Sequence, residues 1–391
     1  MVSNKRKIAV FTGTRAEYGL LSSLLKLIKK SEETELLLYV GGTHLSTSHG
    51  YTIERIIEDG FTITETLDFL LGSDTAVGVA KSLGLATMAA AEAMSRTTPD
   101  LIVVLGDRYE VLGVAQAAMI ACIPIAHIHG GERTEGLIDE AIRHAVTKMS
   151  HLHFTATNEY KKRVEQLGED PSRVFNVGAP GIDVIHNICL LDRQELTKSL
   201  GLCITDSPFA VVTYHPVTLE KDGGINELES MLDCLVELDD FKFIITLPNS
   251  DMHNKKLVSL LNTFVQNNID RVLLTESLGQ LRYLSAVKHC EFGIGNSSSG
   301  LIEVPTFNVP TINIGDRQRG RVAGTTVIQC EGTYEDIKKS IERARSLEFK
   351  RICREAQNPY GNGGSSEKIF SVLRDYPLTN LLNKSFVDLD G

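Results

Sequence analysis

Several polar segments in the first half of the chain stand where predicted strands end. Gly106-Asp107-Arg108 sets a carboxylate beside a guanidinium, which suits a catalytic acid or base with its charge partner and equally suits a structural ion pair. The next predicted strand leads into His127-Ile128-His129-Gly130-Gly131-Glu132, and Asp139 follows in the first turn of a helix. The helix dipole favours the ionised form of Asp139, and Arg143, one turn later, is expected on the same face. Such a set of side chains could transfer protons around one ligand.

His127 and His129 also have the spacing of a metal-ligand pair, because alternate residues of a strand point the same way. Glu132 or Asp139 could supply the third ligand that a metal needs. Against this, the seven cysteines are scattered without a CxxC motif, and no further histidines gather near the pair. We therefore predict acid–base chemistry without a metal, with a structural role for these residues as the alternative.

The second half contains a segment that is typical of an anion-binding loop. In Gly295-Asn296-Ser297-Ser298-Ser299-Gly300 a predicted strand runs into small polar residues that open a helix. Backbone N–H groups and the hydroxyls of Ser297 and Ser298 would then surround a diphosphate. Glu303, further along that helix, is placed to accept two hydrogen bonds from a ribose diol.

Other candidate binding residues also follow predicted strands. Arg15 opens a predicted helix, where a guanidinium suits a phosphate, although a surface pair with Glu17 is the alternative. His215 and Asn249 each come after a strand of the second half, where the imidazole could act on a ligand and the amide could bind hydroxyls. The segment 316–321 suits a polyanion, or else forms a solvated basic turn; its arginines are Arg317, Arg319 and Arg321. The loop that contains Arg15, residues 13–19, lacks the GxGxxG pattern, so nothing there supports nicotinamide binding.

The composition fixes the broad class of protein. With 391 residues, of which 42% are hydrophobic and 23% charged, the chain is long enough for two or three globular domains. Forty basic and fifty acidic side chains give a net charge of −10, which argues against nucleic-acid binding. No apolar run is long enough for a membrane span or a signal peptide. Scattered cysteines, odd in number, indicate a reducing compartment, so we expect a cytoplasmic protein.

Short β-branched runs alternate with segments of helical periodicity, which predicts parallel βαβ units. Strands are expected at residues 7–12, 35–40, 101–105, 123–128, 151–155 and 174–177, and then at 209–213, 241–246, 271–274, 290–294 and 309–314. Helices are expected at residues 18–30, 76–95, 111–120 and 137–149. We predict two doubly wound Rossmann-like α/β domains with a ligand cleft between them. Their expected limits are residues 1–185 and 186–360, and a C-terminal helix within 361–391 is expected to pack back on the first domain.

Taken in order along nearly the whole chain, these motifs resemble those of the hydrolysing UDP-N-acetylglucosamine 2-epimerases of bacterial sialic-acid (nonulosonate) biosynthesis. The matching segments are Gly13-Thr14-Arg15-Ala16-Glu17-Tyr18, Gly106-Asp107-Arg108, residues 127–132, Ile142-Arg143-His144, His215-Pro216-Val217-Thr218, residues 295–300 and Ile314-Gly315-Asp316-Arg317-Gln318. The resemblance implies a GT-B fold, a UDP-amino sugar substrate, and release of UDP and N-acetylmannosamine without metal or other cofactor. It also implies a homo-oligomer, dimeric or tetrameric, with a role in capsule polysaccharide synthesis.

The resemblance assigns roles to individual positions. Binding roles fall on Arg15, His215, Asn249, Ser297, Ser298, Glu303 and Arg317, to which we add His44, Arg108 and Arg321 as substrate contacts. Catalytic roles fall on Asp107, Asp139 and Glu132, with His129 and His215 as further candidates. Several relatives have a carboxylate where this chain has His129, so either His129 or Glu132 could take over that acid–base role. Non-hydrolysing relatives carry a Gln-His-Arg signature where this chain has Gly42-Thr43-His44-Leu45-Ser46.

The implied reaction explains why several acid–base groups would surround one ligand. Departure of UDP from C1 acidifies the neighbouring C2 proton, so elimination gives a glycal, and water and a proton then add with inversion at C2. The sequence does not decide between UDP-N-acetylglucosamine and UDP-N,N'-diacetylbacillosamine, which differ at C4 and C6. A GT-B glycosyltransferase and a non-catalytic UDP-sugar sensor are the competing functions, and the candidate carboxylates argue against the sensor.

Overall fold

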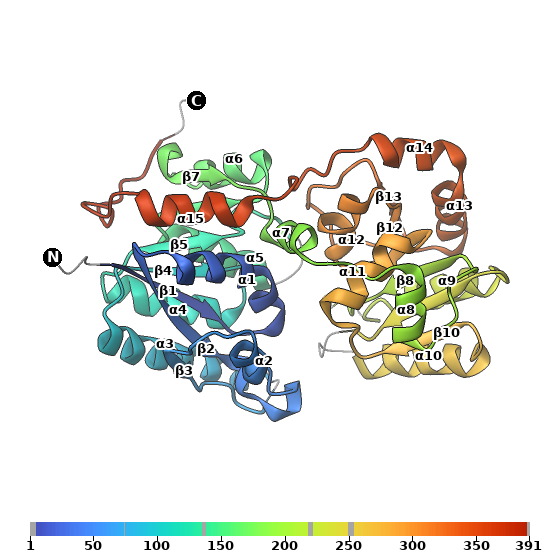
Figure 1. Cartoon of the computed structure of the whole chain (residues 1–391), viewed down its shortest axis with the longest axis horizontal. Coiled ribbons are helices and arrows are strands. Elements are labelled where there is room, and N and C mark those ends of the chain that lie inside the picture. Colours follow the sequence, from blue (N-terminus) through green and yellow to red (C-terminus); the bar gives the residue numbers. More distant parts are fainter. Residues whose placement is uncertain (1–4, 74, 135–137, 218–221, 249–253, 389–391) are drawn as a thin grey trace. The chain divides into compact units, whose positions relative to one another are not determined.

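The computed structural model describes the chain apart from residues 1–4, 74, 135–137, 218–221, 249–253 and 389–391 (Figure 1). The chain divides into two compact units. Unit 1 holds the described residues of Met1–Glu132, Ile138–Val184 and Gly363–Gly391, and unit 2 holds those of Arg133–Leu137 and Ile185–Asn362. The C-terminal segment therefore belongs to unit 1, although the whole of unit 2 separates it in sequence from the rest of that unit.

Within the described residues, unit 1 is built on a seven-stranded parallel sheet in the order β3-β2-β1-β4-β5-β6-β7. The strands are β1 (Arg6–Thr12), β2 (Thr34–Gly41), β3 (Glu65–Leu67), β4 (Leu101–Leu105), β5 (Ile125–Ile128), β6 (Leu152–Thr155) and β7 (Val174–Asn176). Their side chains are largely buried, as expected for a parallel sheet that is covered on both faces. The strand order reverses between β1 and β4, where Val10 pairs with Val103, and ligands of doubly wound sheets bind at such a switch point.

Helices on both faces of this sheet fix where its loops lie. They are α1 (Arg15–Lys30), α2 (Ile53–Glu58), α3 (Ala76–Thr97), α4 (Tyr109–Ile120), α5 (Ile138–Met149), α6 (Asn158–Gln166), α7 (Pro180–Asn187) and α15 (Ser365–Asp375), with 3₁₀ turns η1 (Gly42–Leu45), η2 (Thr47–His49) and η3 (Pro171–Arg173). The last helix, α15 (red in Figure 1), packs beside α1. The Asp183 carboxylate accepts hydrogen bonds from the backbone N–H groups of Ser365 and Ser366 at 2.9 and 2.6 Å, and so fixes the start of α15.

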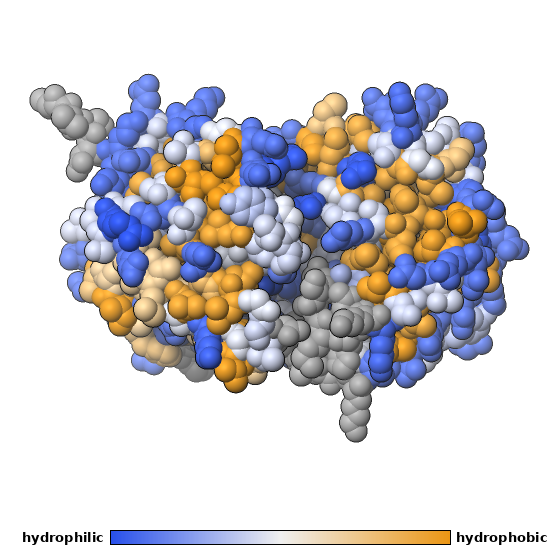
Figure 2. Space-filling view, turned by 90° about the horizontal axis from the view of Figure 1, so that it is seen from below, coloured by the Kyte–Doolittle hydropathy of each residue, from blue (hydrophilic) through white to orange (hydrophobic). Residues whose placement is uncertain are grey.

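Part of the surface of unit 1 is apolar. Val77 and Met88 of α3 and Ile120 at the end of α4 are exposed, and Figure 2 shows apolar surface (orange) on the side of unit 1 where α3 lies. None of the described helices is both long and apolar enough to cross a membrane.

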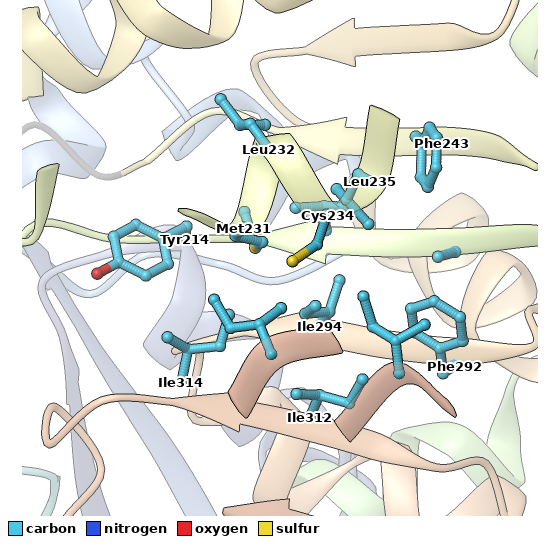
Figure 3. Close-up of a cluster of buried hydrophobic side chains, with 14 of the residues drawn as sticks. Tyr214, Met231, Leu232, Cys234, Leu235, Phe243, Phe292, Ile294, Ile312 and Ile314 are labelled. Carbon is cyan, nitrogen blue, oxygen red and sulfur yellow. The ribbon is translucent and has the colours of Figure 1, made fainter. Parts of the chain in front are cut away.

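Unit 2 repeats the architecture with a parallel sheet in the order β10-β9-β8-β11-β12-β13, six strands among its described residues. The strands are β8 (Phe209–Thr213), β9 (Lys242–Thr246), β10 (Val272–Thr275), β11 (Phe292–Gly295), β12 (Thr311–Ile314) and β13 (Val327–Cys330). The helices are α8 (Arg193–Leu200), α9 (Ile225–Val236), α10 (Asn254–Asn267), α11 (Gly279–His289), α12 (Ser299–Ile302), α13 (Tyr334–Arg345) and α14 (Leu347–Glu355), with the 3₁₀ turn η4 (Val304–Phe307). Figure 3 shows the core between the sheet and α9, where Met231 and Leu235 pack toward Ile294 and Ile312.

The predicted strands are found in both halves and the four predicted helices in the first half, with ends that shift by a few residues; residue 137, the predicted start of one helix, lies outside the described residues. The sequence analysis missed two edge strands, β3 and β13. β3 is only three residues long, and β13 alternates buried and less buried residues, so neither forms a long apolar run. A further difference concerns the helix after residues 295–300, called the serine loop below. This helix, α12, is a single turn that ends at Ile302. Pro305 starts the next 3₁₀ turn and cannot continue a helix.

Candidate active site

Asp107, directly after β4, is bound by an arginine from another helix. Nε of Arg143 in α5 donates to Oδ2 of Asp107 at 2.9 Å, and a second nitrogen of the same guanidinium contacts that oxygen. Arg143 also donates to the backbone oxygen of Glu132 at 3.0 Å and to Oε2 of Glu140 at 2.6 Å, and its side chain is only 1% exposed. The expected pairing of Asp107 with its neighbour Arg108 is wrong, because Arg108 binds Oε1 of Glu110 at 2.7 Å instead.

The histidine pair does not have the geometry of two metal ligands. His127 is completely buried, with Nε2 2.8 Å from the backbone oxygen of Gly106 and Nδ1 3.1 Å from Oγ1 of Thr147. Burial lowers the pKa of His127 to about 3, so its ring is neutral. β5 ends at Ile128, and His129 has the left-handed φ of 69°, which breaks the alternation that a strand would impose. No group of three potential ligands with metal-binding geometry occurs in the described part of the chain.

His129 is paired with Glu132. Nδ1 of His129 lies 2.6 Å from Oε1 of Glu132, and both side chains are largely buried. Because an ionised carboxylate only accepts hydrogen bonds, this contact assigns the proton to Nδ1. Nε2 has no hydrogen-bond partner among the described residues and is the nitrogen that can exchange a proton with a ligand. The arrangement is that of a histidine base oriented by a carboxylate.

Asp139 lies in the first turn of α5, one turn before Arg143, and is partly exposed. Burial raises its pKa, and the negative charge of Asp107 raises it further. A carboxyl group whose pKa is raised in this way is a candidate for holding a proton at the site. The structure thus brings together Asp107, Asp139 and the His129–Glu132 pair around Arg143.

Arg15 and His44, the other substrate contacts predicted in unit 1, have surroundings that differ from those expected. Arg15 is exposed at the start of α1, but its predicted surface pair with Glu17 does not form, because Glu17 is buried and accepts from the backbone N–H of Gly13 at 2.7 Å. His44 is also fully buried. Its Nε2 lies 3.1 Å from Oγ1 of Thr12 and its Nδ1 2.7 Å from Oγ1 of Thr52. A direct bond from His44 to substrate would require one of these contacts to be given up, so in this structure His44 supports the loop after β2.

In unit 2, Asn296 organises the predicted nucleotide-binding residues. Its side chain accepts from the backbone N–H of His215 at 2.7 Å and donates to the backbone oxygen of His215 at 2.8 Å. Its own backbone oxygen accepts from Arg317 at 3.1 Å and from Gln318 at 2.9 Å. Asn296 is completely buried, and the sequence analysis did not assign it a role of its own. A polar residue directly after a buried strand was the signal that could have identified it.

The serine loop has a tighter backbone than the sequence suggests. Gly295 has φ of 138°, and a Cβ there would lie 2.0 Å from the backbone oxygen of Thr213, so only glycine fits. Ser297 and Ser298 follow, partly exposed, before the single turn α12. Glu303 therefore lies just beyond that turn rather than along a helix. A single turn has a smaller dipole than a full helix, so the hydroxyls and the free N–H groups would have the larger share in the predicted anion binding.

The arginines after β12 have different contacts. Arg317 turns back to the Asn296 oxygen and so lies beside the serine loop. Arg319 is exposed and pairs with Asp316 at 3.0 Å. Arg319 and Arg321 both line a hollow of unit 2 that also includes Glu227 and Gln329. The expected polyanion site at these arginines stays a prediction, and Arg317 is the member adjacent to the serine loop. Asn249 falls outside the described residues, as does Thr218.

His215 is partly buried beside these groups. Burial lowers its pKa to about 3, and the positive charge of Arg317 contributes in the same direction. The imidazole is thus neutral at physiological pH and can donate or accept one hydrogen bond without carrying charge.

Comparison with known proteins identifies the class. Residues 26–374 match the family model described as UDP-N-acetylglucosamine 2-epimerase, and the chain belongs to this family. It is 39% identical over 387 residues to a protein of Campylobacter jejuni named GDP/UDP-N,N'-diacetylbacillosamine 2-epimerase (hydrolyzing), covering 99% of this chain and 100% of that protein. It is 37% identical to the polysialic acid biosynthesis protein P7 of Escherichia coli, covering 98% of this chain and 97% of that protein. These matches confirm the predicted family, and at the level of that family they confirm the expectation of an epimerase acting on a UDP-amino sugar.

Solved structures confirm the predicted fold. The UDP-N-acetylglucosamine 2-epimerase of Neisseria meningitidis, solved with UDP-N-acetylglucosamine bound, has a TM-score of 0.82 at 19% identity, covering 94% of this chain and 99% of that chain. A Listeria monocytogenes protein described as a putative UDP-N-acetylglucosamine 2-epimerase has a TM-score of 0.80 at 18% identity, covering 95% and 96%. At these identities the likeness concerns the fold alone.

Proposed function

We propose that this chain is a hydrolysing 2-epimerase that acts on UDP-N,N'-diacetylbacillosamine. The observation that carries the proposal is the group of acid–base side chains around Arg143, in a member of a 2-epimerase family. The choice of sugar is supported by two relatives named for this substrate and for hydrolysis, from Campylobacter jejuni at 39% identity and Legionella pneumophila at 34%. A relative from Neisseria meningitidis named UDP-N-acetylglucosamine 2-epimerase is 28% identical, which makes UDP-N-acetylglucosamine the second candidate.

The proposed chemistry has two stages. The bond between C1 and the UDP oxygen breaks while a base removes the C2 proton, which leaves a glycal and UDP. Water then adds at C1 and an acid delivers a proton to the opposite face of C2, so the free sugar has the manno configuration. Each stage needs a positioned acid or base, typically worth about 10²–10⁴-fold in rate.

Unit 1 offers two sets of groups for the proton transfers. Nε2 of His129, with Glu132 holding the proton on Nδ1, is suited to one transfer. Asp139, whose pKa is raised by burial and by Asp107, is suited to holding the proton for the other. Arg143 would hold the Asp107 carboxylate in position.

Unit 2 offers the groups for the leaving nucleotide. Ser297, Ser298 and Arg317 would bind the diphosphate as its negative charge develops, which is worth several kcal/mol when the donors are fixed in advance. The Asn296 contacts to His215 and Arg317 support such fixation. Neutral His215 would add an uncharged hydrogen bond, and Glu303 would accept from the ribose hydroxyls.

The biological setting follows from the same comparisons. We infer that the product feeds the synthesis of a nine-carbon acidic sugar, and a relative named for polysialic acid biosynthesis supports a role in surface polysaccharide. The described cysteines are all unpaired, which supports a reducing cytoplasm. Exposed apolar side chains on α3 and α4 support a homo-oligomer.

The proposal is tested by supplying each UDP-sugar alone, without any acceptor, and measuring UDP release. We expect steady release from both sugars, with kcat/KM at least about tenfold higher for UDP-N,N'-diacetylbacillosamine, because buried groups that bind a substrate amide discriminate strongly against its absence. A preference for UDP-N-acetylglucosamine would select the second candidate. Release that requires an added acceptor sugar would contradict hydrolysis and indicate a glycosyltransferase.

A further inference from the structure

Two buried glutamates that the proposed mechanism does not use flank Gly13 in unit 1. Glu17 is in the first turn of α1 and Glu110 in the first turn of α4, and the two helices begin at the same sheet edge because β1 and β4 are parallel neighbours. Glu17 is 6% exposed and Glu110 1%. The Gly13 N–H donates to Oε2 of Glu17 at 2.7 Å, and a Cβ on Gly13 would lie 3.1 Å from Oε1 of Glu110. Both carboxyl groups therefore approach the same glycine.

Only one cation balances this pair among the described residues. Nε of Arg108 donates to Oε1 of Glu110 at 2.7 Å, and Arg108 also attracts Glu17 at longer range. Glu17 forms no ion pair of its own in the described chain, and its other polar contacts are with the backbone N–H groups of Gly13 and Thr14. Oε1 of Glu17 and Oε2 of Glu110 are buried, and neither has a hydrogen-bond partner among the described residues. Two buried negative charges beside one guanidinium are costly, and proteins avoid that cost by protonating one of them.

The surroundings decide which carboxyl group keeps the proton. Glu110 has the short bond to the guanidinium, whereas Glu17 has no ion pair of its own among the described residues. Burial raises the pKa of Glu17, and the charge of Glu110 raises it further, while Arg108 and the backbone N–H groups of Gly13 and Thr14 oppose the shift. Glu17 is thus the neutral member of the pair.

We propose that Glu17 is a neutral carboxylic acid at physiological pH and that Glu110, as the single counter-charge of Arg108, is a positioning residue that holds this arginine for an anionic ligand. The bond to Oε1 of Glu110 uses only Nε of Arg108, and the two terminal amino groups of Arg108 have no partner among the described residues. The Arg108 side chain is 47% exposed, so these groups are accessible. With Glu17 neutral, the three side chains sum to zero charge; with both glutamates ionised, the sum is −1 and would repel an anion. The role of Arg108 in substrate binding rests on the proposed function.

A purely structural role makes a different prediction. Glutamates in the first turn of a helix stabilise it most when ionised, because the N-terminus carries partial positive charge. If Glu17 and Glu110 were only helix-stabilising residues, both would be ionised at neutral pH, and neither would affect ligand binding more than folding.

The first test is independent of catalysis and uses the intact, ligand-free chain. Infrared difference spectroscopy detects the C=O stretch of a protonated carboxylic acid, and we expect this band at pH 7 in the parent protein and its loss in Glu17→Gln. Glu169→Gln is the matched control, since Glu169 is equally buried but His153, Lys148 and Lys384 lower its pKa to about 2. Titration of the parent protein to alkaline pH should remove the band without any substitution. A parent protein without the band, or a band that persists in Glu17→Gln, would overturn the neutral acid.

The second test separates positioning from stability. Glu110→Gln should raise KM for the UDP-sugar about tenfold, the effect of losing one charge-assisted hydrogen bond that orients Arg108, while kcat changes much less. Glu17→Gln, which keeps a neutral group and the Glu110–Arg108 bond, should raise KM less at pH 7 and should abolish the rise of KM at alkaline pH. Equal KM in Glu110→Gln and the parent protein would contradict the positioning role. If the parent protein turns over no UDP-sugar, the proposed function fails, yet the infrared result still decides the protonation of Glu17.

Discussion

Nδ1 of His129 lies 2.6 Å from Oε1 of Glu132, and this contact gives the two residues different roles. The carboxylate takes the proton-bearing nitrogen, so Nε2 remains available for proton transfer. The left-handed backbone of His129, φ 69°, turns the residue out of β5, whereas His127 stays within the strand and the core. The sequence analysis left open which member of the pair acts on substrate, and this geometry favours His129.

His129→Gln should therefore lower kcat by at least about 10² while UDP binding, measured by calorimetry, stays within about threefold of the parent protein. Glu132→Gln should also lower kcat, because an amide can donate to Nδ1 and so favour the wrong tautomer. His127→Gln is the control: it disturbs two buried hydrogen bonds, and its activity should fall only in parallel with the melting temperature. Near-parental kcat in folded His129→Gln would exclude this histidine from the mechanism.

Asp139 and Asp107 should respond differently to amide substitution. Asp139→Asn should lower kcat by at least about 10² with little change in melting temperature, because the Asp139 side chain is partly exposed. Asp107→Asn removes a carboxylate from the buried Arg143, so we expect loss of kcat together with destabilisation of up to about 3 kcal/mol, moderated by the remaining bonds to Glu140 and Glu132. Thermal unfolding and product NMR on both variants provide the measurement. Destabilised but fully active Asp107→Asn would assign that residue a structural role alone.

Removing the groups of unit 2 that are predicted to bind the diphosphate should weaken UDP binding without unfolding the protein. Ser298→Ala combined with Arg317→Ala should weaken UDP binding at least about tenfold by calorimetry, because a hydroxyl and a charged donor are both lost. Arg319→Ala is the matched control, since Arg319 is exposed and pairs with Asp316. Unchanged UDP affinity in the double variant would contradict the assignment of this loop.

Asn296→Ala tests whether the buried Asn296 side chain positions the groups that are predicted to bind UDP. The substitution removes both side-chain bonds to the His215 backbone, so UDP affinity should fall although Asn296 is buried and touches no ligand. The melting temperature should fall as well, because buried backbone groups of His215 lose their partners. A variant that loses stability but binds UDP with parental affinity would limit Asn296 to a structural role.

Stability should depend on pH through Glu17. Its pKa in the folded protein is raised above the ordinary glutamate value of 4.5, so the folded state holds a proton that the unfolded state has released. The free energy of unfolding should therefore fall as the pH rises from about 4.5 toward the raised value, and Glu17→Gln should flatten this dependence. Denaturant unfolding of both proteins across this range is the measurement; parallel curves would mean that Glu17 is ionised when folded.

The sequence predicted the doubly wound halves well because parallel strands that are buried on both faces form continuous apolar runs, as in Leu101–Leu105 and Phe209–Thr213. It also predicted the strand-end positions of Asp107, His129 and Ser297. It could not predict partners that come from distant segments. Arg143 binds Asp107 across 36 positions of sequence, and Asn296 binds His215 across 81. The adjacent pair Asp107–Arg108 was misleading, because neighbouring residues at a strand end can point to different partners.

One experiment tests the central claim most directly. The chain is incubated in D₂O with UDP-N,N'-diacetylbacillosamine and no acceptor, and the products are followed by proton NMR. Hydrolysis with inversion predicts UDP and a free manno-configured 2,4-diacetamido sugar that carries deuterium at C2, because the proton that returns to C2 comes from solvent through an acid–base group. A free sugar that keeps its original configuration and its C2 proton would contradict the account, since simple hydrolysis of the C1–O bond needs neither His129 nor Asp139.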